Sequence, residues 1–578
     1  MRKYHLYSVS LVATFMLACS AIPSPPETTL TLIHVGDIHG HLVSRPHTRD
    51  DGTPREQGGV ARMFTRIQDI RQRHPNHLLI NTGDTIQGSA EAMYTQGQAM
   101  VDVLNRFSFD AFAPGNWEFV YGTTRFLELF AGPNAKAPWS SVAANLYYDG
   151  APYAASAGKR VLPPYVIKHV NGIKVGIMGM TTDRGPQVVG RAVTQGFRFT
   201  KGDSEVRELV KTLRETEKVD VIVMISELGL ANNIRLAEAT PGIDVVLSSD
   251  MHEVTSKPVI TKTGTLILEE GQDGSVVGEL TLRLASGKVV GHTHTSHTIS
   301  PAVAENPAIA AAVTQARKSF LTGPDFKRHI NPFNGTALAR PIDTVVGFTQ
   351  VPLHRSNFSH QDMPAVIEGS AHDFLTDAFR SQAKAEIGAL RGFRYGTHVP
   401  VGPIRMEDLY HFVATGPLIA RGTIKGQQLV QQIEAAADGS LNPKVDAWTG
   451  GWLFNFSGVR MRIDPYAKAG SRASDVEVLN EATKQWEPLN KDRDYSYASY
   501  YYTRDPELIN LVPAKNITVV MDTHGKPADG VEVVVQYLES LPNRSAKTEL
   551  NRIQLVRPLP PSNYGMPEIQ PWRGATAP

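Results

Sequence analysis

The sequence predicts an α/β protein, because short apolar runs alternate with helical patterns and five of those runs end in metal-binding side chains. From Thr29 to about Leu284, β-rich segments alternate with amphipathic segments such as 60–67 and 205–211, a pattern typical of layered α/β domains. The five endings are 37–41, 81–84, 115–118, 226–227 and 250–253. One such ending means little, but five indicate a single site at the carboxyl edge of a sheet, where open α/β folds place their ligands.

The length and composition indicate an ordinary globular protein with several domains. The 578 residues are too many for one hydrophobic core, and a chain of this length corresponds to about three or four domain-sized units. A hydrophobic content of 41% and a charged content of 20% exclude a disordered chain. The formal net charge is +1 and no long lysine or arginine run occurs, so the sequence does not support a nucleic-acid partner.

The N-terminus predicts a lipoprotein signal peptide over 1–19 and a tether over 20–28. Two basic residues precede the apolar stretch 11–17, which is too short for a membrane span. Small residues before Cys19, the only cysteine, resemble a bacterial lipoprotein cleavage box, so Cys19 is expected to be lipidated. A plain secretory signal with an incidental cysteine is the alternative. We therefore expect a lipid-anchored protein of the bacterial cell envelope, facing the periplasm or in the outer membrane.

The remaining chain divides into two predicted domains and a connection. Antiparallel edge strands at 275–282 and 288–290 close the first domain. Helices are expected around 371–385 and 426–437 in the second. The predicted boundaries are 29–295 for the first domain, 296–343 for the linker with a helix, 344–556 for the second domain and 557–578 for a Pro-rich tail.

Seven polar side chains form a predicted metal-binding set. Its members are Asp37, His39, Asp84, Asn116, Glu227, Asp250 and His252. A dinuclear site with metals about 3.5–4 Å apart needs roughly this many ligands and a bridging carboxylate, for which Asp84 is the natural candidate because it follows the central strand. For any one residue the alternative is a turn former, a helix cap or an ordinary polar histidine.

Several segments resemble a known superfamily. GDIHGH, NTGDTIQGS and GNWEFVYG resemble the calcineurin-like metallophosphoesterase signature, and FRYGT with the region after it resembles the C-terminal domain of 5′-nucleotidases. The resemblance implies a four-layered α/β/β/α metallophosphoesterase domain followed by a smaller α+β 5′-nucleotidase C-terminal-type domain that closes over the substrate. GNWEF and GFRYGT are most similar to the Sox-type thiosulfohydrolase branch, whose members carry two manganese ions.

The implied cofactors are two divalent metal ions, with Mn²⁺ expected first and Mg²⁺, Ca²⁺ or Zn²⁺ as alternatives. Glu227 and Asp250 stand where the superfamily carries histidines, and this shift toward carboxylates suits hard ions. It also has a cost. Together with Asp37 and Asp84, these residues carry four negative charges, which cancel the charge of two divalent cations. A metal site without net positive charge attracts an anionic substrate less strongly than a positively charged site does. Reduced or lost activity is therefore an open alternative.

The resemblance also implies substrate contacts. Trp117 occupies the position where the superfamily carries a proton-handling histidine. Because indole cannot transfer a proton at neutral pH, this residue favours substrates whose leaving group needs no protonation. The alternative is that Trp117 only packs against its neighbours. Asn116, Trp117 and Arg394 are the expected catalytic residues, and Arg394 is expected to bind a substrate anion. The expected base-stacking aromatics are Phe454 and Phe456, with Tyr500 or Tyr501 on the opposite face, although aromatics in strand-like runs commonly belong to the core.

The resulting functional hypothesis is an exported, metal-dependent hydrolase of the 5′-nucleotidase superfamily. Its partner is expected to be a small anionic, nucleotide-like substrate, attacked at a phosphoester or phosphoanhydride by a metal-activated hydroxide. One alternative is a Sox-like thiosulfohydrolase that cleaves a sulfonate from a cysteine of a carrier protein. The other is a degenerate surface lipoprotein without catalytic activity.

Overall fold

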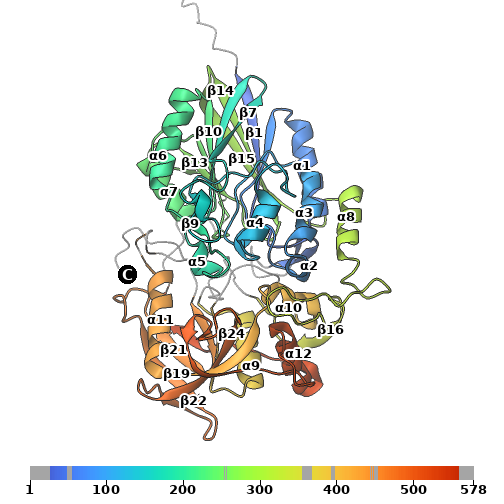
Figure 1. Cartoon of the computed structure of the whole chain (residues 1–578), viewed down its shortest axis with the longest axis vertical. Helices are drawn as coiled ribbons and strands as arrows, with labels where there is room; N and C mark the ends of the chain where they lie inside the picture. The colour runs from blue at the N-terminus through green and yellow to red at the C-terminus, as the bar shows by residue number, and fades with distance from the viewer. Residues whose placement is uncertain are drawn as a thin grey trace, which may run out of the picture.

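The protein folds into two α/β domains stacked along its long axis, shown in Figure 1 as an upper blue-to-green part and a lower orange-to-red part. The computed structural model describes residues 27–47, 55–252, 254–255, 257–354, 367–391, 398–442, 444, 447 and 453–558. Within these residues no helix is long and apolar enough to cross a membrane. The expected α/β class is confirmed.

Two sheets form the centre of the N-terminal domain. The first has the order β15 (Lys288–Thr298), β14 (Val276–Ala285), β1 (Thr28–Val35), β4 (His77–Asn81) and β5 (Ala111–Phe112). The second has the order β12 (Val259–Ile260), β13 (Leu266–Glu269), β11 (Val245–Ser248), β10 (Val221–Ser226), β8 (Ile173–Met180) and β7 (Tyr165–Val170). The pairs β1–β4, β4–β5, β8–β10, β10–β11 and β11–β13 are parallel. The expected antiparallel edge strands are β14 and β15, and both are longer than predicted.

The two sheets pack face to face with helices on their outer faces, which confirms the four-layered arrangement. Leu32 of β1 and Val223 of β10 belong to one buried cluster between the sheets. Because side chains alternate along a strand, Ile33 points the other way and packs with the helices beside the first sheet. The helices of the two outer layers are α1 (Val60–Arg73), α3 (Gln98–Leu104) and α4 (Thr123–Phe130) on one side, and α6 (Asp203–Lys211) and α7 (Leu230–Ala239) on the other.

The C-terminal domain is built around a five-stranded sheet, two smaller sheets and the two-stranded pair of β25 (Leu508–Ile509) and β26 (Val512–Pro513). The large sheet has the order β20 (Phe454–Ser457), β17 (Ile387–Arg391), β24 (Asp494–Tyr501), β19 (Leu418–Lys425) and β27 (Lys515–Val519). The smaller sheets are β18 (Gly402–Arg405), β16 (Val345–Thr349) and β28 (Ser545–Ala546), and β23 (Gln485–Pro488), β22 (Ala473–Asn480), β21 (Val459–Ile463) and β29 (Ile553–Leu555). The two expected helices are present as α9 (Ser370–Gln382) and α11 (Gly426–Ser440).

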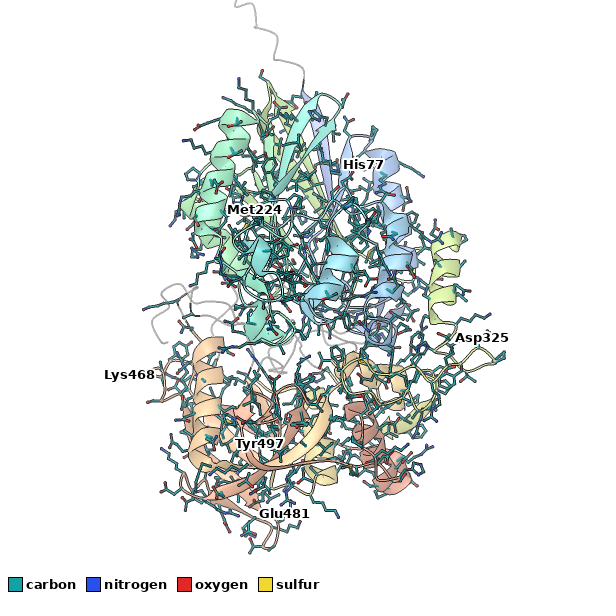
Figure 2. The ribbon with its side chains drawn as sticks, in the orientation of Figure 1. His77, Met224, Asp325, Lys468, Glu481 and Tyr497 are labelled. Atoms are coloured by element: carbon teal, nitrogen blue, oxygen red, sulfur yellow. The ribbon has the colours of Figure 1, made fainter. Side chains whose placement is uncertain are left out.

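Helices α9 and α12 (Gly530–Ser540) cover one face of the large sheet, and α11 covers the other. Side chains fill both domains: Met224 and Tyr497 lie inside, whereas Asp325, Lys468 and Glu481 lie at the periphery (Figure 2). Apolar contacts join the two domains, because Ala90 and Met93 of the N-terminal domain belong to the same buried cluster as Phe374 and Leu409 of the C-terminal domain.

Charged and hydroxyl groups join the domains at α10 (Met406–Phe412), which packs against α2 (Ala90–Tyr94). Arg317, at the end of α8 (Pro307–Arg317), donates to Glu91 at 2.6 Å and to Glu407 at 2.5 Å. The hydroxyls of Tyr94 and Tyr410 lie 2.8 Å apart. Arg317 and both carboxylates are largely buried, so these contacts resist screening by salt and hold the C-terminal domain against the N-terminal one.

Glu532 on α12 makes the stability of the C-terminal domain depend on pH. Its Oε1 is buried and has no hydrogen-bond partner within the described ranges, and burial raises the pKa of Glu532 to about 7, although Arg340 lies 3.4 Å from Oε2. Between about pH 4.5 and 7 the unfolded state ionises while the folded state keeps its proton. Stability therefore falls as pH rises, by up to about 3 kcal/mol.

In the Glu532→Gln variant, folding stability should not fall between about pH 4.5 and 7 through this group. The variant should gain thermal stability over the wild type between pH 5 and pH 8, measured by thermal unfolding. Glu539→Gln is the matched control, because Glu539 pairs with the same arginine but is 48% exposed. Parallel stability curves for wild type and Glu532→Gln would contradict the prediction.

Candidate metal centre

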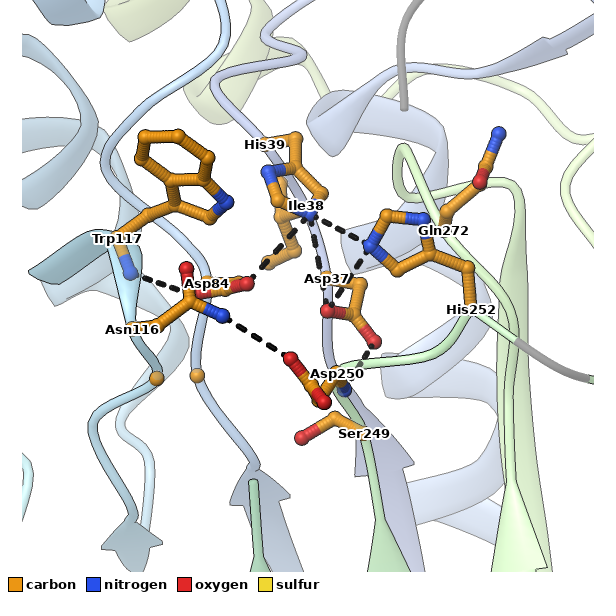
Figure 3. A network of polar contacts seen from close by, with 12 residues as sticks. Asp37, Ile38, His39, Asp84, Asn116, Trp117, Ser249, Asp250, His252 and Gln272 are labelled. Carbon is orange, nitrogen blue, oxygen red and sulfur yellow. Dashed lines mark hydrogen bonds and ion pairs between the residues drawn. The ribbon is translucent and has the colours of Figure 1, made fainter. Parts of the chain in front are cut away.

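All seven predicted metal-binding residues lie at the carboxyl ends of strands, where the edges of the two sheets meet. Figure 3 labels all of them except Glu227. Asp37 and His39 follow β1, Asp84 follows β4 and Asn116 follows β5. Glu227 follows β10 of the second sheet, and Asp250 and His252 follow β11. Parallel pairing places these ends at one edge, so the structure brings the whole set together as the sequence predicts.

Four of these residues form a compact donor cluster. One ligand atom from each of Asp37, His39, Asp84 and His252 lies within 4.8 Å of the others, and all four residues are buried. The Nε2 atoms of His39 and His252 are 2.9 Å apart, and Asp37 Oδ1 lies 3.7 and 3.5 Å from them. Asp37 Oδ1 accepts no hydrogen bond from the part of the chain that the structure describes. Converging nitrogen and oxygen donors around an unsatisfied carboxylate oxygen fit a divalent cation.

The other three residues lie beside Asp84. Asn116 Nδ2 donates to Asp250 Oδ1 at 3.0 Å, and Ser249 donates to Glu227 Oε2. Asn116 Oδ1 and Glu227 Oε1 are buried and make no hydrogen bond among the described residues. These two unsatisfied oxygens, with the carboxylates of Asp84 and Asp250, offer donors suited to a hard cation.

The electrostatics of the centre favour a bound cation. Burial, followed by repulsion from Glu118 and Asp37, raises the pKa of Asp84 well above its usual range. Burial and the carboxylates of Asp84, Asp37 and Asp250 do the same to the pKa of Glu227. Burial also works against ionisation of Asp37, but the neighbouring His252 and His39 hold its pKa below the usual range. A divalent cation would relieve the repulsion that these carboxylates impose on one another.

The backbone at the centre is strained. Five of the seven residues have left-handed φ values, a region that residues other than glycine rarely adopt. These values are 47° for Asp37, 46° for His39, 49° for Asp84, 90° for Asp250 and 61° for His252. Strain of this kind persists where the surrounding structure enforces it, and it gathers at functional sites. Left-handed residues also occur elsewhere in the chain, but five of them in one cluster of donors add a second observation that points to a functional site.

Glu118 holds two of the site loops together, a role that the sequence analysis missed. Its carboxylate accepts N–H bonds from Asp84, Thr85, Ile86 and Gly115 at 2.9, 2.7, 3.3 and 2.6 Å. The loop after β4 is thereby tied to the loop after β5. The sequence feature that could have predicted this role is the position of Glu118 directly after Trp117 in GNWEF. Arg184 was also missed: its Nη2 lies 2.9 Å from Asp250 Oδ2.

A cavity opens from this centre toward the C-terminal domain. Its walls include Asp84, Asn116, Trp117, Asp250 and His252 from the N-terminal domain, Phe333 from the linker, and Arg391, Tyr500, Tyr502, Arg504, Asn510 and Leu511 from the C-terminal domain. A ligand at the metal centre would therefore touch both domains. Cavities at domain interfaces with a few polar groups are the usual binding sites of small molecules.

The structure corrects part of the expected substrate contacts. Trp117 and Tyr500 line the cavity, but Phe456 is 1% exposed and packs in the C-terminal core, and Phe454 packs against the same cluster. Tyr501 packs there as well. Besides Trp117 and Tyr500, the cavity is lined by the rings of Phe333, Phe412 and Tyr502, and the Arg504 guanidinium lies 4.7 Å from the centre of the Tyr502 ring. Arg394 and Cys19 lie outside the described residues.

Comparison with known proteins identifies the class. Residues 30–254 match the calcineurin-like phosphoesterase family, and residues 345–506 match the 5′-nucleotidase C-terminal domain. The chain therefore belongs to the metal-dependent hydrolases that join these two domains.

Individual relatives agree with this assignment. The chain is 26% identical to a snake venom 5′-nucleotidase of Naja atra over 81% of its own length and 88% of the relative. Its fold is similar to that of a 5′-nucleotidase precursor from Thermus thermophilus, with a TM-score of 0.74, 22% identity and coverage of 91% and 99% of the two chains. It is equally similar to the sulfate thiohydrolase SoxB of Thermus thermophilus, with a TM-score of 0.75, 19% identity and coverage of 93% and 98%.

Gly115→Ala tests the packing of the centre. An added Cβ would overlap Asp84 Oδ1 and would lie 2.6 Å from the Asp84 backbone nitrogen and 2.7 Å from Glu227 Oε1, so the loop after β4 and both carboxylates must shift. We expect Mn²⁺ affinity to fall about 10- to 100-fold, measured by calorimetric titration. Gly122→Ala is the control: its methyl group meets nothing within 4 Å, and its φ of 92° costs stability only. Unchanged Mn²⁺ binding by Gly115→Ala would contradict the packing described above.

Proposed function

We propose that the protein is an exported hydrolase that uses two divalent ions, Mn²⁺ first, to cleave a phosphoester or phosphoanhydride of a nucleotide-like substrate. Asp37, His39, Asp84 and His252 would hold one ion, and Asp84 with Asn116, Glu227 and Asp250 would hold the other. Such ions supply a hydroxide at neutral pH and stabilise the charge of the transferring phosphoryl group. The observation that carries the proposal is the cluster of buried, strained donors opening into a cavity between the domains.

The protein's own residues supply positioning. The backbone N–H of Trp117 donates to Asp84 Oδ1 at 2.8 Å and so orients the proposed bridging carboxylate. The Trp117 indole lines the cavity but cannot deliver a proton to a leaving group. Weakly basic leaving groups are therefore favoured over a nucleoside alkoxide. Phe333 and Tyr502 offer aromatic faces for a base at a distance from the metals.

The test is a substrate screen on the full chain. Protein loaded with Mn²⁺ should hydrolyse p-nitrophenyl phosphate and members of a panel of nucleoside mono- and diphosphates and NAD. Asp84→Ala should lose at least about a thousandfold in kcat/KM, because several kcal/mol of charge stabilisation are removed, together with bound manganese. Asp69→Ala, on the exposed face of α1, should retain both. No turnover on the panel with Mn²⁺, Mg²⁺, Ca²⁺ or Zn²⁺ would refute the hydrolase and favour a non-catalytic surface lipoprotein.

A thiosulfohydrolase is the second candidate, and Trp117 is the residue that favours it. A sulfur leaving group needs no proton donor, so the indole is compatible with cleavage of a sulfonate from a cysteine of a carrier protein. Release of sulfate from a peptide bearing a cysteine-bound sulfonate, measured by ion chromatography, would support this function. Phosphate release without sulfate release would exclude it.

We also propose that the chain is anchored in the bacterial cell envelope through a lipid on Cys19, on the basis of the apolar stretch 11–17 and the small residues before that cysteine. Expression in a bacterial host followed by mass spectrometry of the mature N-terminus would detect acyl chains on Cys19. An unmodified N-terminus at another residue would indicate an ordinary secretory signal.

A further inference from the structure

A short hairpin of the C-terminal domain lies at the mouth of the cavity. Strands β25 and β26 pair antiparallel, and the two turn residues between them, Asn510 and Leu511, line the cavity. Leu511 is also 60% exposed, so it faces the cavity and the solvent at once. Metal donors such as Asp84 and His252 line the same cavity from the N-terminal domain. A ligand that extends from the metal centre toward the solvent can therefore reach Leu511.

The backbone of this turn is unfavourable at Leu511. The φ values of Asn510 and Leu511 are 46° and 68°, which match a type I′ turn, and that turn favours Asn followed by Gly. Asn510 fits the first position, but at Leu511 the left-handed backbone brings the Cβ atom close to the following carbonyl oxygen. In the part of the chain that the structure describes, Leu511 is the only apolar residue apart from glycine with a left-handed φ.

The rest of the hairpin enforces the turn. Ile509 and Val512 are buried in the core of the C-terminal domain. The backbone N–H of Asn510 donates to the carbonyl oxygen of Tyr500 at 2.8 Å and so ties the turn to β24. Backbone strain persists where the surrounding structure enforces it, and such strain gathers at binding and active sites. The unfavourable conformation of Leu511 is therefore a built-in feature of the fold.

Exposure and strain together distinguish Leu511 from other surface leucines. A single exposed apolar side chain is common and needs no explanation. Within the described ranges, however, Leu511 is the only exposed large hydrophobic residue that lines the cavity, and it also carries the backbone strain. Asparagine at this position would avoid both costs. A ligand that covers the Leu511 side chain would offset the cost of exposing it to water.

Apolar side chains accompany Leu511, and the charges beside the hairpin pair with each other. Leu508 of β25 and Val188 of α5 (Gly185–Val188) also line the cavity. Arg504 Nη2 donates to the carbonyl oxygen of Val189 at 3.5 Å, which brings the end of α5 to the C-terminal domain. Arg504 Nε also lies 3.7 Å from a carboxylate oxygen of Asp505, so these two charges largely cancel. The end of a ligand that reaches the hairpin therefore meets apolar surface.

We propose that Leu511 is a specificity-determining residue, which packs against the part of the substrate's leaving group that lies farthest from the metals. This inference rests on the proposed hydrolase. It narrows the substrates to those whose leaving group ends in an apolar or aromatic surface, in preference to small polar leaving groups. Burial of a whole leucine side chain corresponds to about a 10- to 100-fold change in binding. Because Leu511 is already partly covered, we expect a contribution of about 5- to 20-fold.

Equilibrium binding tests this role without turnover. Naphthylmethylphosphonate and methylphosphonate carry the same non-hydrolysable head group and differ in the apolar end. They would be titrated into the full-length, Mn²⁺-loaded protein by calorimetry. Leu511→Asn should bind naphthylmethylphosphonate about 5- to 20-fold more weakly than the wild type does, and methylphosphonate within about twofold. Leu511→Met, which keeps an apolar side chain on the same backbone, should bind both ligands within about twofold of the wild type.

The stability of Leu511→Asn separates a ligand contact from a structural role. Since asparagine tolerates the left-handed region, this variant should unfold about 2 °C higher than the wild type, although it binds the apolar ligand less tightly. A lower unfolding temperature would mark Leu511 as a structural residue and overturn the inference.

Leu550→Asn is the matched control, because Leu550 is an exposed leucine of the C-terminal domain that does not line the cavity. The same substitution there should change the binding of neither phosphonate. Equal weakening of both phosphonates in Leu511→Asn, or no weakening of either, would refute the role of Leu511.

A kinetic comparison separates this inference from the proposed function. In Leu511→Asn, kcat/KM for naphthyl phosphate should fall about 5- to 20-fold, whereas that for acetyl phosphate, whose leaving group is small, should stay within about twofold. If the wild type hydrolyses neither compound, the hydrolase is refuted while the phosphonate titrations still decide the role of Leu511. If both compounds are hydrolysed and Leu511→Asn affects them equally, that role is refuted and the hydrolase stands.

Discussion

The burial of several carboxylates at the meeting edge of two sheets is the constraint on which the rest of this structure depends. Asp37, Asp84 and Glu227 are almost fully inaccessible to water, and charged groups in such a place are costly unless cations or hydrogen bonds compensate them. Two histidines and Arg184 beside Asp250 offset part of this cost, and the buried oxygens that remain unsatisfied among the described residues suit a metal. Strained backbone at the donors shows that the loops are held in this arrangement by their surroundings.

The second domain completes the site. Arg317 joins α8 to carboxylates of both domains, and the Tyr94 and Tyr410 hydroxyls meet across the interface. These contacts bring β17 and the end of β24 over the metal centre, so the cavity has metal donors on one wall and arginine and aromatic side chains on the other.

The metal donors could be predicted because their placement follows from local rules. Asp37 and His39 come directly after an apolar strand, and the carboxyl ends of parallel strands must meet. The aromatic contacts could not be predicted in the same way. Phe454 and Phe456 lie two residues apart on one strand and share a face, but the sequence does not say whether that face meets the cavity or the core. Helix α11 covers this face of the strand, so Phe456 lies in the hydrophobic core and Phe454 packs against it.

The sequence by itself determined the α/β class, the order of the two domains and the donor set, because strand periodicity and the polar residues after each strand are local features. The sequence also showed that the site carries extra negative charge, because Glu227 and Asp250 stand where the superfamily has histidines. Only the tertiary structure decided which side chains surround that charge. Arg184 and Arg391 are more than 200 residues apart along the chain and carry no local motif. Both line the same cavity because the C-terminal domain packs over the candidate metal centre, and such an arrangement is a property of domain packing that no segment encodes alone.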